Sequence, residues 1–244
     1  KKMYLGQLWH EETYPDDYVL CKIGFNLAKK CREIHLKGMI LANEWNEGNV
    51  VIDPQNGLVS LANFYKESPY KGSVYRADVG MLQYLAPECY IDSMYDYYSD
   101  CYSIAVFLYR LFIGGFPLDG KASEEFLANS DLLIDEAAPV IYGSNALFAF
   151  DPNNQSNSIR NHVNELMPRL YEIQTQRWDT TDERIKKCFI QTFSDGLQAD
   201  NKRKRTTDRE WMQVFKVVAK TGLKQCPVCH RRLFAGRTVC PWCK

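Results

Sequence analysis

The sequence predicts a mainly α fold (α+β) with small β-hairpins, and three observations lead to this prediction. Apolar residues recur every three or four positions between Leu20 and Ile34, which is the period of one face of a helix. Residues 104–113 are apolar nearly all round, as in a helix that lies in the middle of a domain. Two pairs of cysteines crowd the last nineteen residues, a pattern typical of a small metal-binding module. We therefore expect a helical domain over residues 1–222 and a second, small module over residues 225–244.

The composition excludes several classes of protein. The 244 residues carry 30 acidic and 30 basic side chains, so no overall charge attracts nucleic acid or an anionic membrane. No apolar run of about 18 residues exists and no signal peptide opens the sequence, so we expect a cytoplasmic protein that does not enter the membrane. Five cysteines are scattered, which indicates buried free thiols rather than a disulfide framework. They are Cys21, Cys31, Cys89, Cys101 and Cys188.

The first helix is expected to begin near Asp16 and Asp17, because carboxylates in the first turn interact favourably with the helix dipole. Its apolar stripe ends at Gly38, a residue type that commonly ends helices. An irregular polar loop follows. Two short apolar runs, at 49–52 and 58–61, then flank five turn-forming residues, which predicts a β-hairpin. A polar loop between a helix and a hairpin is where we expect a functional site.

The second half of the helical domain is expected to contain three further helices. They lie within 96–117, within 182–196 and after the capping-box sequence at 207–210. Residues 118–181 have few periodic runs and are interpreted as an insert. The Asp, Asn and Pro residues at 151–153 indicate a turn cluster rather than ligands of a cation.

The cysteine-rich module predicts a structural zinc site. Two C-x2-C pairs are separated by ten residues, so two knuckles can converge on one tetrahedral Zn²⁺. The predicted ligands are Cys226, Cys229, Cys240 and Cys243. Gly236 and its polar neighbours fit a short hairpin that joins the two pairs. Four thiolates fill the coordination shell, which favours a structural role. Since these residues offer little core of their own, we expect the metal to supply a folding energy on the order of 10 kcal/mol.

The helical domain resembles the C-lobe of protein kinases. His35-x-x-Gly38 fits the exit of the helix before the catalytic loop, and residues 49–53, N-V-V-I-D, fit the strand after it. Residues 61–64, L-A-N-F, fit L-A-D-F, and residues 86–88 are A-P-E. The whole chain also resembles bacterial kinase-like proteins that end in a zinc ribbon. The resemblance implies a kinase-like C-lobe lacking an N-lobe, because residues 1–34 contain no glycine-rich loop or strand lysine.

The resemblance assigns structural roles to three residues. Asp100, at the start of the central helix, is expected to hold the backbone of the catalytic loop; from its position alone it is also a helix N-terminal carboxylate. Arg205 is expected to pair with Glu88 of the A-P-E motif.

The catalytic positions of the kinase pattern are degraded. Counting forward from His35 places Asn43 where the catalytic Asp belongs, whereas counting back from Asn49 places Glu44 there. The loop is one residue longer than the family pattern, so the two counts disagree. Asn49 matches the metal-binding Asn, but Asn63 replaces the metal-binding Asp of D-F-G. Because an Asn is neutral and a poor anchor for Mg²⁺, we expect binding of ATP and Mg²⁺ to be weak or absent.

Three functions are compared from these observations. The first is a catalytically impaired, pseudokinase-like module that binds, scaffolds or regulates a protein partner. The alternative is an active Ser/Thr protein phosphotransferase that uses Glu44 as base, with an N-lobe that this chain does not contain. A third interpretation, in which Arg231, Arg232 and Arg237 of the ribbon contact nucleic acid, is disfavoured because ribbons of this size mostly mediate protein contacts or cap a domain.

Overall fold

The computed structural model describes residues 2–9, 14–62, 68–69, 79–92, 95–164 and 167–243. The α-helices are α1 (Asp17–His35), α2 (Cys89–Asp92), α3 (Tyr97–Phe112), α4 (Lys121–Ala128), α5 (Ile134–Ala138), α6 (Leu170–Thr180), α7 (Glu183–Ile190) and α8 (Asp208–Thr221). The strands are β1 (Met3–Tyr4), β2 (Met39–Ile40), β3 (Val50–Ile52), β4 (Val59–Leu61), β5 (Ser68–Pro69), β6 (Leu223–Gln225) and β7 (Arg232–Phe234). Short 3-10 helices cover Leu5–Trp9, Ala42–Glu44, Glu47–Asn49, Val79–Tyr84 and Ala199–Lys204, and π-helical turns cover Pro139–Ser144 and Gln191–Asp195.

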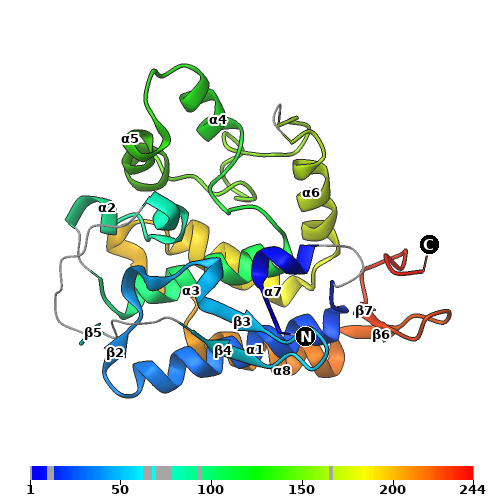
Figure 1. Ribbon diagram of the computed structural model, residues 1–244. Coiled ribbons are helices and arrows are strands. Elements are labelled where there is room, and N and C mark those ends of the chain that lie inside the picture. Colours follow the sequence, from blue (N-terminus) through cyan, green and yellow to red (C-terminus); the bar gives the residue numbers. More distant parts are fainter. Residues whose placement is uncertain are drawn as a thin grey trace.

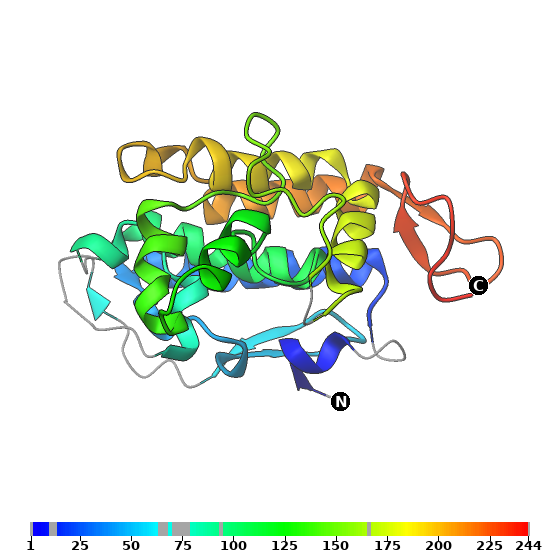
Figure 2. The ribbon, with the colours of Figure 1, turned by 90° about the horizontal axis from the view of Figure 1, so that it is seen from above.

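The described residues form a mainly helical fold with small antiparallel sheets, as the sequence predicts. In Figure 1, α3 runs through the middle of the molecule, α1 and α8 lie side by side at the bottom, and α4 and α5 lie at the top. Figure 2 shows the strands β6 and β7 beside one end of the main helices. No helix in the described part of the chain combines the length and the apolarity that are needed to cross a bilayer.

Helix α1 begins where the acidic pair predicts. The Asp16 side chain accepts a hydrogen bond from the backbone N–H of Val19 at 2.9 Å and so caps the helix. The predicted apolar stripe is confirmed, because four of its five residues are fully buried and the fifth is partly buried. These are Leu20, Ile23, Leu27, Cys31 and Ile34. The helix approaches α8 so closely that a Cβ on Gly24 would lie 2.5 Å from the Phe215 ring, so a side chain there would push the two helices apart.

Helix α3 is the core of the domain, as its apolar sequence predicts. Asp96 and Ser99 form a reciprocal capping box at its start. From Cys101 to Tyr109 every residue is buried. The helix ends where Gly114 and Gly115 adopt φ values of 87° and 66°, a conformation that favours glycine.

The segment interpreted as an insert, residues 118–181, packs into the main core. It contains α4, α5 and α6, which are short. The Trp178 side chain of α6 stacks on Phe150 with ring centroids 4.6 Å apart, and Tyr171 is buried. The turn cluster is confirmed, because the Asp151 carboxylate accepts hydrogen bonds from the backbone N–H groups of Asn153 and Asn154. Residues 118–181 therefore enlarge the core of the domain.

The remaining predicted elements are also present. β3 and β4 form the predicted antiparallel hairpin, with Val51 opposite Ser60, and β1 adds a third strand. α7 continues into a π-helical turn that ends at Gly196. The capping box before α8 is formed by Thr207 and Glu210. The five scattered cysteines are buried free thiols, as predicted.

Candidate functional site

The four C-terminal cysteines form a candidate metal centre. Their Sγ atoms all lie within 4.8 Å of one another. The Sγ atoms of Cys226 and Cys243 are 3.4 Å apart, and those of Cys229 and Cys240 are 3.6 Å apart. Four sulfurs placed 2.3 Å from a tetrahedral Zn²⁺ are separated by about 3.8 Å, so the tetrad fits this ion. Because all four positions would be filled by protein sulfur, bound zinc would hold the two knuckles together and leave no position for a substrate.

The local backbone brings the first cysteine pair into place. Cys226 follows β6, and Cys229 lies in the turn that leads to β7. The backbone N–H of Cys226 donates to the carbonyl of Arg231 at 2.9 Å, and His230 adopts a φ of 59° in this turn. Backbone N–H groups of Cys229 and Val228 lower the pKa of the Cys226 thiol to about 6, which favours the thiolate that a metal requires. The hairpin therefore encloses the first pair, whereas the sequence predicts a hairpin between the two pairs.

The metal-binding module shares the core of the helical domain, which corrects a second expectation. Leu233 and Phe234 are buried, and the Phe234 ring lies 6.2 Å from that of Phe112 in α3. The module thus has apolar packing of its own against α3, so the metal is not its only source of stability.

Asp17 joins the module to α1. Its carboxylate accepts hydrogen bonds from the backbone N–H of Phe234 at 2.7 Å and from the Arg237 side chain at 2.7 and 3.0 Å. The Asp17 side chain is fully buried. Burial raises the pKa of Asp17, and Arg237 opposes this shift because it stabilises the carboxylate. From its place in the sequence, Asp17 is expected only to interact with the helix dipole, and this contact with the module is not predicted.

Asp100 holds the loop between α1 and the hairpin, which is the contact that the resemblance implies. Its carboxylate is fully buried and accepts a hydrogen bond from the backbone N–H of Leu41 at 2.6 Å. It also accepts one from the Trp45 indole N–H at 3.2 Å. A buried charge is stable only when it is paired and hydrogen-bonded, and these donors meet that condition.

His35 completes this arrangement and was not identified as a functional residue from the sequence. Its Nε2 lies 3.0 Å from the Asp100 carboxylate, and its Nδ1 lies 2.7 Å from the carboxylate of Asp208 in α8. Burial alone would lower the pKa of His35, but the hydrogen bonds to Asp100 and Asp208 raise it to about 9. An imidazolium with both N–H groups donating therefore links α1, α3 and α8.

Most of the polar side chains described here for the loop between α1 and the hairpin form hydrogen bonds or ion pairs within the protein. The Asn49 side-chain amide donates to the backbone carbonyl of Glu44 at 2.8 Å, and Asn49 is buried. Glu47 is paired with Arg110 of α3. The Glu44 carboxylate is partly exposed and makes no hydrogen bond or ion pair with any described residue. Asn43 lies in the 3-10 turn Ala42–Glu44.

Two residues of the kinase pattern, Asn63 and Phe64, lie outside the described residues. The structure therefore brings Asn49 and Glu44 together but does not place Asn63 relative to them.

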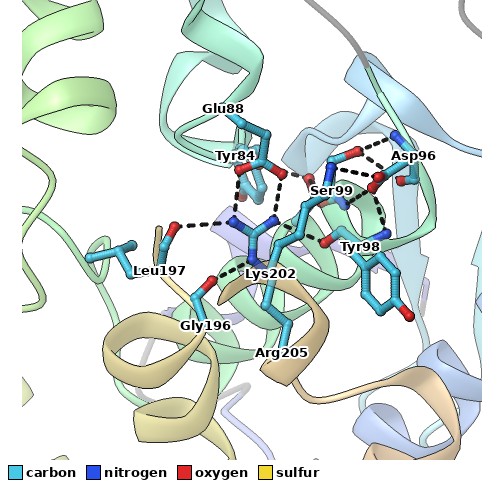
Figure 3. Close-up of polar contacts among 10 residues, drawn as sticks. Tyr84, Glu88, Asp96, Tyr98, Ser99, Gly196, Leu197, Lys202 and Arg205 are labelled. Carbon is cyan, nitrogen blue, oxygen red and sulfur yellow. Dashed lines mark hydrogen bonds and ion pairs between the residues drawn. The ribbon is translucent and has the colours of Figure 1, made fainter. Parts of the chain in front are cut away.

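Arg205 and Glu88 form the predicted buried ion pair (Figure 3). Both guanidinium Nη atoms lie 2.7 Å from a carboxylate oxygen of Glu88. The Arg205 side chain is fully buried and that of Glu88 is 7% exposed. The guanidinium also donates to three backbone carbonyls, those of Gly196, Tyr98 and Leu197. The pair thus fastens the A-P-E segment to the chain that leads into α8.

No protein-family model matches this chain. The geometry of its two sites, the cysteine tetrad and the loop held by Asp100, therefore carries the functional argument.

Proposed function

We propose that this chain is a protein kinase-like C-lobe with a structural zinc ribbon, and that it works as a protein-binding module rather than as a phosphotransferase. The contacts that support the kinase-like interpretation are the long-range ones. Asp100 contacts the loop backbone, and Arg205 pairs with the Glu of A-P-E, as the sequence resemblance implies. Neither contact follows from local helix or strand formation.

The observation that carries the second part of the proposal is the shortage of free carboxylates in the loop. Phosphoryl transfer depends on carboxylates that hold Mg²⁺ and orient the nucleophile. The loop from Leu41 to Asn49 contains two, and Glu47 is already neutralised by Arg110. Glu44 alone remains. The other candidate positions, Asn43, Asn49 and Asn63, are neutral amides, which are weak ligands for a hard cation.

The described residues support the same interpretation in another way. Among them, the cysteine tetrad is the one group of three or more His, Cys, Asp or Glu side chains that lie close enough to share an ion. A protein-binding role needs no cation ligands. It needs a fixed surface, and the contacts of Asp100 and Arg205 hold the elements that form one in place.

The alternative function is an active Ser/Thr phosphotransferase in which Glu44 is the base. The observation in its favour is that Glu44 is partly exposed and unpaired among the described residues, while Asn49 fixes its backbone. In that case Glu44 would accept the proton of the substrate hydroxyl, and an N-lobe on another segment or chain would bind the nucleotide.

A thermal-shift titration with ATP, in the presence and absence of Mg²⁺, tests whether this chain by itself binds the nucleotide; binding would favour the alternative function. A ligand at a hundred times its Kd stabilises by about 2.7 kcal/mol, so tight binding is easily detected. We expect no Mg²⁺-dependent shift at millimolar ATP and no labelled phosphate on a general protein substrate. Asn63→Asp restores the missing carboxylate and should gain little.

A clear Mg²⁺-dependent shift, together with phosphate transfer that Glu44→Gln abolishes, would overturn the proposal. Zinc content must be equal in all samples, so that loss of the ribbon is not mistaken for loss of nucleotide binding.

A further inference from the structure

A groove between α1 and α8 has a strongly basic rim. Its volume is about 950 Å³. Six of its lining residues are cationic, and none is acidic. These cations are Lys22, Arg32, Arg209, Lys216, Lys220 and Arg232. Because the whole chain has no net charge, this one-signed rim is a local feature that creates a positive potential over the groove.

Most of these cations have no carboxylate partner. Arg32 contacts Asp208 at 3.2 Å. The other five form no ion pair with any residue that the structure describes. Lys216 and Lys220 are one helical turn apart on α8 and both are exposed. Unpaired like charges at this spacing repel one another, so an acidic ligand would stabilise them.

The floor of the groove is apolar. Phe25 of α1 and Met212 and Ala219 of α8 line it and are only partly buried. The Tyr18 ring at one side is covered, because the Arg232 guanidinium lies 3.2 Å from its centroid. Nucleic-acid sites pair cations with aromatic faces on which bases stack, and this face is occupied. The groove is better suited to a segment that carries both acidic and aliphatic side chains.

The chain carries such a segment itself. Six consecutive residues, 131–136, have the sequence D-L-L-I-D-E, and all are exposed. Leu132, Leu133 and Ile134 are 43%, 69% and 40% exposed, although large aliphatic side chains are usually buried. Asp131 and Asp135 form no ion pair with described residues. An acidic and apolar protrusion is thus the chemical complement of the basic groove with an apolar floor.

The two surfaces cannot meet within one molecule. In Figure 1, α5, which contains Ile134, lies at the top, whereas α1 and α8 lie at the bottom on the other side of α3. We infer that residues 131–136 of one copy dock into the α1–α8 groove of a second copy. A two-fold dimer would form this contact twice between the same two copies, and a head-to-tail assembly would form it once between each pair of neighbours. The contact is small, so the association is weak and sensitive to salt.

The inference rests on the proposed protein-binding role and names a second copy of the chain as the partner. It does not depend on nucleotide binding, so one of the two proposals can be refuted while the other stands. Sedimentation velocity of the full, zinc-loaded chain tests it. The average mass should rise with protein concentration at about 0.05 M NaCl and rise much less at about 0.5 M NaCl. Lys216→Glu with Lys220→Glu, the groove variant, should weaken association at least about tenfold.

Asp131→Lys with Asp135→Lys, the segment variant, should weaken association to the same extent. It leaves Glu136 in place, because the Glu136 carboxylate caps α5. An equimolar mixture of the two variants should associate again, since each supplies the intact surface that the other lacks. Lys29→Glu with Lys204→Glu is the control, because both lysines are exposed and lie outside the groove. The two substitutions change the net charge by the same amount as those of the groove variant. It should associate as the parent does.

Four results would overturn the inference: a parent chain that stays monomeric at low salt; folded groove or segment variants that associate as the parent does; a mixture that does not associate; or a control that loses association equally. Melting curves establish that each variant is folded. A labelled single-stranded oligonucleotide that binds the parent but not the groove variant, while the parent stays monomeric, would assign the groove to nucleic acid instead.

Discussion

Replacing Arg205 by alanine is expected to lower the free energy of unfolding by about 3–5 kcal/mol, because it leaves a buried carboxylate without its partner. The guanidinium donates two hydrogen bonds of 2.7 Å to Glu88, whose side chain is 7% exposed. It also satisfies three carbonyls, but water that enters the vacated space can replace those bonds. We therefore assign most of the loss to the unpaired charge of Glu88.

Urea unfolding followed by circular dichroism measures this loss. Arg160→Ala is the matched control, because Arg160 also contacts both carboxylate oxygens of a partner, Asp179, at 3.2 and 2.5 Å. That pair is exposed, so its removal should cost less than about 1 kcal/mol. Arg205→Met combined with Glu88→Leu removes both charges and should be more stable than Arg205→Ala. The reasoning is refuted if Arg205→Ala costs no more than Arg160→Ala, or if the double variant is no more stable than the single one.

Three further predictions concern the other contacts. The pKa of His35 is about 9 in the folded protein against an ordinary 6.5, so its stabilisation is complete below pH 6.5 and is lost as the pH rises toward 9. The corresponding loss in the free energy of unfolding is about 3 kcal/mol. His35→Gln should be less stable than the parent at pH 6, and its free energy of unfolding, measured with urea, should fall less steeply as the pH rises. The chain should bind one Zn²⁺, and Cys240→Ser should remove it and lower the melting temperature; metal analysis that finds no zinc in the parent would contradict this. Asp17→Asn should cost about 3 kcal/mol, because it leaves Arg237 without its buried partner, and limited proteolysis should then release residues 225–243 faster. Equal proteolysis of variant and parent would show that Asp17 does not hold the module.

The elements that the sequence predicts are those with a local signal. The stripe from Leu20 to Ile34, the capping box at Thr207 and the paired cysteines each depend on spacings of a few residues. A spacing of this kind is enough to predict one face of a helix, the start of a helix or a metal-binding knuckle. The contact of Arg205 with Glu88 spans 117 residues and was predicted only through the kinase resemblance.

The contacts that were missed have no local signal. Asp17 is an ordinary first-turn carboxylate by sequence, and its bond to Phe234 joins residues 217 positions apart. His35 was identified only as a helix-exit residue, whereas its bond to Asp208 spans 173 positions. The segment at 118–181 is interpreted as an insert from its few periodic runs, and its helices are indeed short, as α5 with five residues illustrates. Which partner such residues meet is decided by the assembled fold.

The pairing of α1 with α8 also has a consequence for the order of folding. The face of α1 is covered by residues that the ribosome makes more than 170 positions later, as the distances along the chain from His35 to Asp208 and from Asp17 to Phe234 show. During synthesis the part of α1 that packs on α8 therefore stays exposed until α8 has been made, and closing such long loops slows folding. The zinc module is made after α8 and docks on the first turn of α1, so metal capture is expected to be among the last steps. A nascent chain stopped before residue 208 should bind chaperones, and the completed, zinc-loaded chain should not.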